Sequence, residues 1–204
     1  MRNDVTGVVL AGGQSRRMGQ DKRWITLEGR TLFDRALSVL EELFSEVLVV
    51  VAKPNDEMIQ GQSRVVADLI PNCAMAGGLY TGLSCASCSR IFVVACDMPF
   101  LNPEVIACLG YIDPSSDVVM VKLTHGLQPL HAYYSKRCLP LLEGMLKSQQ
   151  FRVQGLAEQP ELAVRIVDEQ EIQELDPHFL SFYNLNTPSD LELAQKIFLH
   201  REVS

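Results

Sequence analysis

The sequence contains no apolar run of the roughly 18 residues that a membrane-spanning helix requires. The N-terminal stretch VTGVVLAGG, residues 5–13, is too short and too rich in glycine for the apolar core of a signal peptide. We therefore expect a cytoplasmic protein that does not enter a membrane.

Positive charge is also scarce, because 18 lysines and arginines stand against 25 aspartates and glutamates, a net charge of -7. Proteins that bind nucleic acid generally need a broad basic face, so nucleic acid is not expected as a partner. One short segment nevertheless gathers Arg16, Arg17, Lys22 and Arg23 against a single acid, Asp21. This local excess of about +3 predicts that the segment binds a small polyanion.

The six cysteines lack the spacing of a metal site or of a disulfide framework. Cys85 and Cys88 form a lone C-x-x-C pair, and Cys73 and Cys96 do not supply a second pair at comparable spacing. We expect all six to be reduced and free of metal, with Cys85 and Cys88 on one face of a helix.

Short apolar segments rich in β-branched residues alternate with helical patterns over the first half of the chain. The expected strands are residues 5–10, 47–52, 64–67 and 91–95, and the expected helices are residues 31–44, about 78–88 and one that starts with Asn102 as N-cap and Pro103. The order βαβαβαβα predicts a doubly wound α/β fold, in which helices cover both faces of a mostly parallel sheet as three α/β/α layers. Ligands of such folds bind outside the carboxyl ends of the strands.

The second half has a looser pattern, without an internal repeat or a low-complexity linker. We expect strands near residues 117–121, 131–134 and 162–167, and a helix over residues 136–147. A last helix begins at Thr187 as N-cap, with Pro188 in its first position and Asp190 three residues after the cap. At 204 residues the chain is expected to form one domain, residues 1–204.

The segment LAGGQSRRMGQDK, residues 10–22, follows the first expected strand but lacks two familiar phosphate-binding patterns. The dinucleotide pattern G-x-G-x-x-G is absent because Gly12 and Gly13 are adjacent and the next glycine is Gly19. The P-loop pattern is absent because Gln20 stands where it requires lysine.

A third kind of phosphate loop fits this segment. Adjacent glycines after a strand let backbone N–H groups approach a ligand closely, while Arg16, Arg17 and Lys22 neutralise phosphate charge. The alternative interpretation is a glycine turn that carries solvated charges.

Two acids follow expected strands at the edge of the sheet where ligands bind. Asp97, in VVACDMP, lies two residues past a strand, where a nucleotide-bound Mg²⁺ would take a carboxylate. Asp68 points to the same edge, and the alternative for both acids is a turn or loop role. Gly77 and Gly78 are expected in a further strand-to-helix loop, and Gly82 in the helix that follows suggests close packing or a nearby ligand.

Five segments together resemble, in this order and spacing, the molybdenum cofactor guanylyltransferase family of the nucleotidyltransferases: LAGGQSRRMGQDK, AGGLYTGL, VVACDMPFL, QPLHAYYS and FYNLNTPSDL. The resemblance runs from about residue 5 to residue 195. It implies Mg²⁺ as cofactor, GTP and molybdenum-loaded molybdopterin as substrates, and molybdoenzymes or other cofactor-biosynthesis proteins as further partners. It also implies a nucleotide-binding half over about residues 1–110 and an acceptor-binding half over about residues 111–204.

The resemblance assigns roles to individual residues. The nucleotide contacts that it implies are Leu10, Ala11, Gly12, Gly13, Lys22, Asp68 and Asp97, and the expected glycine loop adds Gly77 and Gly78. The residues that carry the reaction are Lys22, Arg16, Arg17 and Asp97, with Asp97 as the magnesium ligand, and the acceptor contacts are Asn184 and Asn186. The sequence departs from the family at residues 73–77, CAMAG in place of Gly-Pro-Leu-Ala-Gly, and at Val50 and Val51, where many members carry an asparagine.

The implied reaction transfers GMP from GTP to the terminal phosphate of molybdopterin and releases pyrophosphate. That acceptor phosphate is already ionised at neutral pH, so the site needs positive charge and alignment rather than a general base. His125 and His131 lie in THGLQPLH, and contact with the acceptor is one interpretation of that stretch. A lone histidine is more often a packed or solvated residue than a catalyst, and we expect this of both. Two alternatives stay open: a related transferase that uses CTP or another phosphate acceptor, and a non-catalytic molybdopterin carrier.

Overall fold

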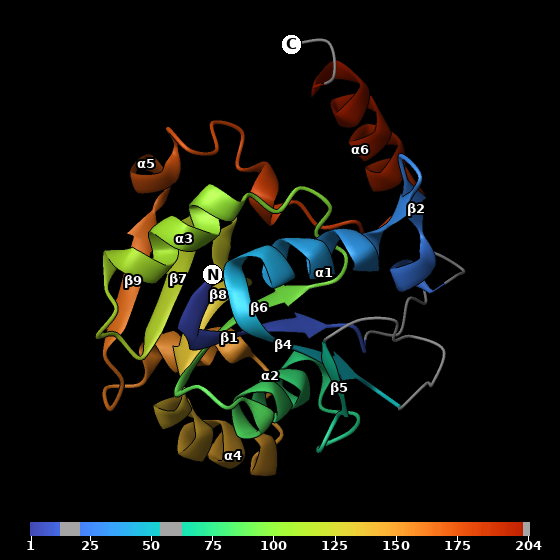
Figure 1. The fold of residues 1–204 in the computed structure, drawn as a ribbon. Helices are drawn as coiled ribbons and strands as arrows, with labels where there is room; N and C mark the ends of the chain where they lie inside the picture. The colour runs from blue at the N-terminus through green and yellow to red at the C-terminus, as the bar shows by residue number, and fades with distance from the viewer. Residues whose placement is uncertain (13–20, 54–62, 202–204) are drawn as a thin grey trace.

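The computed structural model describes residues 1–12, 21–53 and 63–201. Its centre is a seven-stranded sheet in the order β5-β4-β1-β6-β8-β7-β9 (Figure 1). The strands are β1 (Arg2–Leu10), β4 (Phe44–Val51), β5 (Arg64–Ala67), β6 (Arg90–Ala95), β7 (Val118–Leu123), β8 (Gly126–Ser135) and β9 (Val164–Asp168). Strand β8 pairs antiparallel with β6 and β7, and the other pairs in this sheet are parallel. The mostly parallel sheet expected from the sequence is confirmed.

Helices cover both faces of this sheet, as Figure 1 shows. They are α1 (Leu32–Leu43), α2 (Ala74–Cys85), α3 (Pro103–Ile112), α4 (Leu139–Lys147), α5 (Glu169–Ile172) and α6 (Pro188–Arg201), with 3₁₀ turns η1 (Lys22–Trp24), η3 (Lys136–Cys138), η4 (Val153–Glu158) and η5 (Leu180–Phe182). Within the described residues, no helix combines the length and the apolar character needed to cross a bilayer.

Alternation along the strands divides the core into two layers. On β1, Val9 joins a cluster with α1 and α3, whereas Val8 joins a cluster with α2 and α4. Successive side chains of a strand point to opposite faces, so strands made of apolar residues bury both faces. The expected three-layer α/β/α arrangement is confirmed.

The expected helix starts after Asn102 and Thr187 are also present. The Asn102 side chain accepts a hydrogen bond of 2.9 Å from the Glu104 amide, with Pro103 in the first position of α3. The Thr187 hydroxyl accepts one of 3.2 Å from the Asp190 amide at the start of α6. Each bond satisfies an amide that has no partner within its own helix.

The loop predicted at Gly77 and Gly78 is wrong, because α2 already begins at Ala74 and both glycines lie inside it. A Cβ atom on Gly77 would lie 2.6 Å from the Ile70 carbonyl oxygen, and one on Gly78 would lie 3.2 Å from the Leu10 side chain. One turn further, a Cβ on Gly82 would lie 3.0 Å from Val8. The glycines therefore let α2 pack closely on β1 and on the turn before it, and this packing outweighs their low helix propensity.

The predicted shared helical face of Cys85 and Cys88 is wrong as well. Helix α2 ends at Cys85, and Cys88 lies beyond it, where its thiol donates a 3.4 Å hydrogen bond to the Asn3 carbonyl oxygen. All six cysteines are free thiols in the structure.

A small hairpin that the sequence did not predict lies between η1 and α1. Its strands are β2 (Thr26–Leu27) and β3 (Arg30–Thr31), joined by Glu28 and Gly29, whose φ angles are +49° and +73°. Two positive φ values are typical of a type I′ turn. The C-terminal cluster, which we define as Ile25, Leu27, Leu32, Phe100, Leu185 and Ala194, packs this region against α6 (Figure 1). The end of the described chain therefore packs against a segment near its beginning.

Candidate active site

The strand order reverses between β1 and β6. The chain leaves β1 for β4 and β5 on one side and returns to the other side of β1 as β6. Leu10 lies opposite Val50 of β4 and Ala95 of β6, so the segments that follow these strands emerge at one edge of the sheet. Such a switch point is where open α/β sheets bind their ligands.

One ammonium group joins three segments at this edge. Lys22 Nζ donates hydrogen bonds of 2.8 Å to Asp97 Oδ2 and 2.8 Å to Asn186 Oδ1, partners 75 and 164 residues away in the sequence. The Lys22 and Asp97 side chains are 16% and 18% exposed, so this ion pair is largely shielded from water. Of the residues predicted for the site, the structure brings these three into direct contact.

Lys22 is held in place by its neighbours in η1. The Asp21 carboxylate accepts a 3.1 Å hydrogen bond from the Arg23 amide and also pairs with the Arg23 guanidinium. The side-chain hydrogen bond with Arg23 lowers the pKa of Asp21 and raises the pKa of Arg23. Arg23 and Asp21 therefore neutralise each other, and Lys22 is the cation that η1 directs to Asp97.

Asn186 is positioned by the segment before α6. The Leu185 amide donates a 2.9 Å hydrogen bond to the Asp97 carbonyl oxygen, which fastens this segment to the end of β6. The Asp190 carboxylate accepts hydrogen bonds of 2.9 and 2.8 Å from the amides of Asn186 and Thr187. Asn184 is placed differently, because its side-chain amide donates a 3.1 Å hydrogen bond to the nearby Phe182 carbonyl oxygen.

The oxygens around Lys22 have the chemistry of a divalent-cation site. Asp97 Oδ1 is buried and has no hydrogen-bond partner in the described part of the chain, and Asp97 Oδ2 and Asn186 Oδ1 already face one cation. The described residues contain no group of three or more His, Cys, Asp or Glu that could hold a metal ion. One carboxylate plus phosphate oxygens and water is a common ligand set for nucleotide-bound Mg²⁺.

Asp68 organises the turn after β5. Its Oδ1 accepts hydrogen bonds of 3.1 Å from the Ile70 amide and 2.9 Å from the Thr81 hydroxyl. The Thr81 hydroxyl in turn accepts a 2.9 Å hydrogen bond from the Leu69 amide. Thr81, buried on α2, therefore shapes this edge of the sheet, and sequence reasoning missed it because nothing in its local pattern points to Asp68.

Backbone hydrogen bonds fix the exit of β1. The Ala11 amide donates 2.8 Å to the Val50 carbonyl oxygen, and the Leu10 carbonyl oxygen accepts 3.1 Å from the Cys96 amide. A Cβ atom on Gly12 would lie 3.0 Å from the Ala52 backbone nitrogen, so any side chain there, even that of alanine, would have to displace a neighbour. The predicted contacts Gly13, Arg16 and Arg17 lie outside the described residues.

The sequence pattern of the MobA-like NTP transferase domain matches residues 7–161 of this chain. The chain belongs to that family. A "Molybdenum cofactor guanylyltransferase" of Desulfosudis oleivorans is 37% identical over 194 residues, which cover 94% of each chain. A "Probable molybdenum cofactor guanylyltransferase" of Pelotomaculum thermopropionicum is 36% identical over 93% of this chain and 91% of the relative. A crystal structure titled "Molybdopterin-guanine dinucleotide biosynthesis protein A", from Archaeoglobus fulgidus, superposes with a TM-score of 0.82 at 25% identity, covering 96% of this chain and 100% of the other.

Two further residues of this MobA-like transferase stand out beside the site. Trp24, in η1 two positions after Lys22, is 47% exposed, which is unusual for so large an apolar side chain. Asp190 holds the backbone of Asn186 and Thr187, and its place three residues after the N-cap had marked it only as a helix-capping residue.

His131 of this MobA-like transferase is fully buried on β8, and its ring centroid lies 5.2 Å from that of Phe92 and 4.5 Å from that of Phe182. Burial lowers its pKa to about 3. Phe182 directly precedes the 183–186 segment that carries Asn186. His131 is therefore a packed core residue, as the sequence led us to expect, and Phe182 links it to the site.

We expect His131 to make the stability of the fold depend on pH. An unfolded chain protonates this histidine near pH 6.5, whereas the folded chain keeps it neutral down to about pH 3. The free energy of unfolding should therefore fall as the pH drops below 6.5, by about 2 kcal/mol at pH 5 from this residue alone. Urea unfolding of the wild type and of His131→Leu between pH 5 and pH 8 measures this term. The wild type should lose stability faster than the variant, and two parallel curves would contradict the assignment.

Proposed function

We propose that this chain transfers GMP from GTP to the terminal phosphate of molybdenum-loaded molybdopterin, forming a guanine dinucleotide cofactor and releasing pyrophosphate. The names of the relatives that align with more than nine-tenths of the chain support this substrate pair. The observation that carries the proposal is the cluster of Lys22, Asp97 and Asn186 at the switch point of the sheet.

The residues of this cluster supply what phosphoryl transfer requires. The attacking phosphate is ionised at neutral pH, so the protein has to align two polyanions and neutralise the charge on the α-phosphoryl group and the leaving pyrophosphate. Asp97, with Asn186 beside it, would hold Mg²⁺ or another divalent cation, which supplies part of that neutralisation when bound. Lys22 would donate to phosphate oxygens as a second positive charge.

The ion pair of Lys22 and Asp97 suggests how the charge of the Asp97 carboxylate is neutralised when no ligand is bound. Without ligands, the Lys22 ammonium is the counter-charge of the Asp97 carboxylate at 2.8 Å. Asp97 would hold a divalent cation through its carboxylate, and its buried Oδ1, which has no partner among the described residues, is the atom best suited to that contact. Lys22 would donate to the nucleotide phosphates.

The remaining site residues belong to the same proposal. About residues 1–110 bind the nucleotide and about residues 111–204 bind the acceptor, with Asn184 and Asn186 on the acceptor side. Arg16 and Arg17 add positive charge, and the backbone near residues 10–13 approaches the phosphates. The contact of Asn186 with Lys22 supports a role for Asn186 between the two substrates.

The choice of base has to be tested separately. Val50 and Val51 are 2% and 1% exposed at the end of β4, so their side chains lie in the core. Guanine would therefore be recognised by other groups, and a transferase that uses CTP is the alternative to exclude.

The decisive experiment measures pyrophosphate release from GTP, CTP, ATP and UTP in turn, with and without molybdenum-loaded molybdopterin. We expect pyrophosphate release with GTP and not with the other three nucleotides. This release should require both the acceptor and a divalent cation. Preference for CTP would contradict guanine as the nucleotide base. Release with a different phosphate acceptor would contradict molybdopterin as the acceptor. Tight molybdopterin binding without release from any nucleotide would show a carrier instead.

A further inference from the structure

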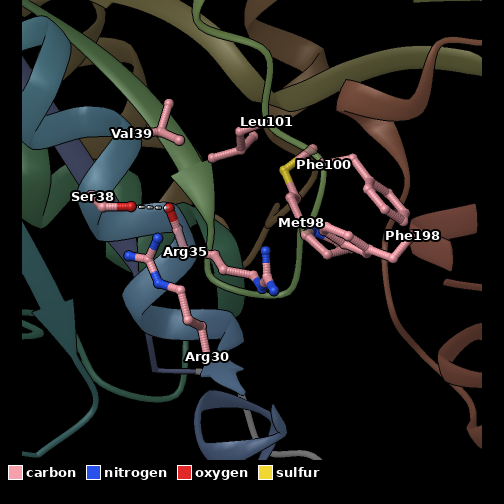
Figure 2. Close-up of a pocket in the computed structure, with 9 residues that line it drawn as sticks. Arg30, Arg35, Ser38, Val39, Met98, Phe100, Leu101 and Phe198 are labelled. Carbon is pink, nitrogen blue, oxygen red and sulfur yellow. Dashed lines mark hydrogen bonds between the residues drawn. The ribbon is translucent and has the colours of Figure 1, made fainter. Parts of the chain in front are cut away.

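A cavity of about 200 Å³ lies between α1, the segment after β6 and α6 (Figure 2). Arg30, Arg35, Met98, Phe100 and Phe198 line it, and the Arg35 side chain extends toward Met98 and Phe198. None of the three residues that form the Lys22 cluster lines this cavity, although Met98, which does, directly follows Asp97 in the chain.

Two cationic side chains stand at this cavity without a carboxylate partner. Neither Arg30 nor Arg35 forms an ion pair within residues 1–12, 21–53 and 63–201. Burial and the charge of Arg30 lower the pKa of Arg35, and only Glu28 acts on it in the opposite direction. Two guanidinium groups that repel each other at a partly buried site favour the binding of an anion.

The hydrogen bonds of both arginines leave donors for a ligand. Arg35 donates to the Leu27 carbonyl oxygen through Nε, at 3.1 Å, and through Nη2, while Nη1 has no acceptor among the described residues. Arg30 makes one long bond of 3.4 Å, from Nη2 to the Asp34 carbonyl oxygen. Arg35 is thus fixed in place by the hairpin, and Arg30, which is exposed, remains able to turn toward a ligand.

Part of the cavity wall, next to Arg35, is aromatic. The Arg35 guanidinium lies 4.4 Å from the centre of the Phe198 ring, and the Phe198 and Phe100 rings stack with centroids 5.0 Å apart and 29° between their planes. The sulfur-bearing Met98 side chain adds a polarisable apolar surface beside them (Figure 2). A flat ring fits such a wall better than a fully hydrated ion does.

We infer that this cavity binds a small aryl phosphate monoester, with the phosphate on Arg30 and Arg35 and the ring against Phe198 and Phe100. A phosphate monoester carries close to two negative charges at pH 7, which matches two guanidinium groups and their forked donors. The cavity is smaller than the roughly 300–1,000 Å³ of typical ligand sites, which suits one ring with one phosphate rather than a dinucleotide.

Calorimetric titration of the full chain with phenyl phosphate tests the inference, and inorganic phosphate and phenol serve as the two halves of the probe. Phenyl phosphate should bind about tenfold or more tightly than either half, because each half makes only one of the two sets of contacts. Arg30→Gln should weaken phenyl phosphate binding about tenfold, since it removes one charge-assisted contact. Arg152→Gln, an equally exposed arginine away from the cavity, should leave binding unchanged.

Two further variants, one in the cavity and one in the Lys22 cluster, make the result unambiguous. Ser38→Phe places a ring in the cavity while both arginines remain, so it should also abolish phenyl phosphate binding, with GTP binding preserved. Lys22→Gln should weaken GTP binding and leave phenyl phosphate binding unchanged. If phenyl phosphate competes with GTP, or binds Arg30→Gln as well as wild type, the inference is overturned. Neither result depends on which reaction the Lys22 cluster catalyses.

Discussion

Asp97→Asn should lower turnover by about three orders of magnitude, because it removes the charge that holds a hard cation while the size of the side chain is kept. Nucleotide binding through Lys22 and the backbone after β1 should persist. Pyrophosphate release measures the first effect, and calorimetry with GTP in the presence and absence of Mg²⁺ measures the second. In the variant, Mg²⁺ should no longer tighten GTP binding.

Asp4→Asn is the matched control for this variant. Asp4 also pairs with a cation at 2.8 Å, the Arg2 guanidinium, but it lies near the start of β1, at the opposite edge of the sheet. The Asp4→Asn variant should keep the full wild-type turnover. If Asp97→Asn turns over at the wild-type rate, the cation is bound elsewhere. If it melts early but is fully active per folded molecule, Asp97 has only a structural role.

Lys22→Ala should lower kcat/KM by about 10- to 100-fold, since the loss of one charge-assisted contact to phosphate costs about 1.5–3 kcal/mol. The same change removes the ammonium that neutralises Asp97. In the absence of nucleotide, the variant should therefore bind Mn²⁺ more tightly than wild type, which paramagnetic resonance can measure. Tighter Mn²⁺ binding together with a lower kcat/KM separates a role in the site from simple damage to the fold.

Lys147→Ala provides the comparison, because Lys147 pairs with Glu143 at 2.7 Å on an exposed helix face. Turnover and Mn²⁺ binding should both stay at the wild-type level in that variant. Unchanged GTP turnover in Lys22→Ala would remove Lys22 from the site, whereas a collapsed thermal transition would make its role structural.

Local pattern was sufficient to predict the central strands and several helix starts. The β-branched runs that became β1, β4 and β6 are apolar on both faces, and the helix starts at Asn102 and Thr187 carry their own caps. The prediction was wrong at Gly77 and Gly78, where contacts with Ile70 and Leu10, distant from the local pattern, decide the conformation.

The site was predictable only in part, for the same reason. The sequence marks Lys22 and Asp97 as polar residues that follow strands or glycines, and it marks Asn186 through its motif. Nothing local reveals that one ammonium group contacts both oxygens, because the partners lie 75 and 164 residues from Lys22. The role of Thr81 at Asp68 is hidden in the same way, since it arises from the packing of α2.

The contact between Lys22 and Asn186 has a consequence for how the protein is made. Lys22 and Asp97 are synthesised before residues 185–187, because the chain grows from its N-terminus. The Leu185 amide bonds to the Asp97 carbonyl oxygen, and Asn186 beside it contacts the Lys22 ammonium group. Synthesis must therefore pass residue 186 before the polar cluster can be complete, and a chain that stops before residue 185 lacks the Asn186 contact.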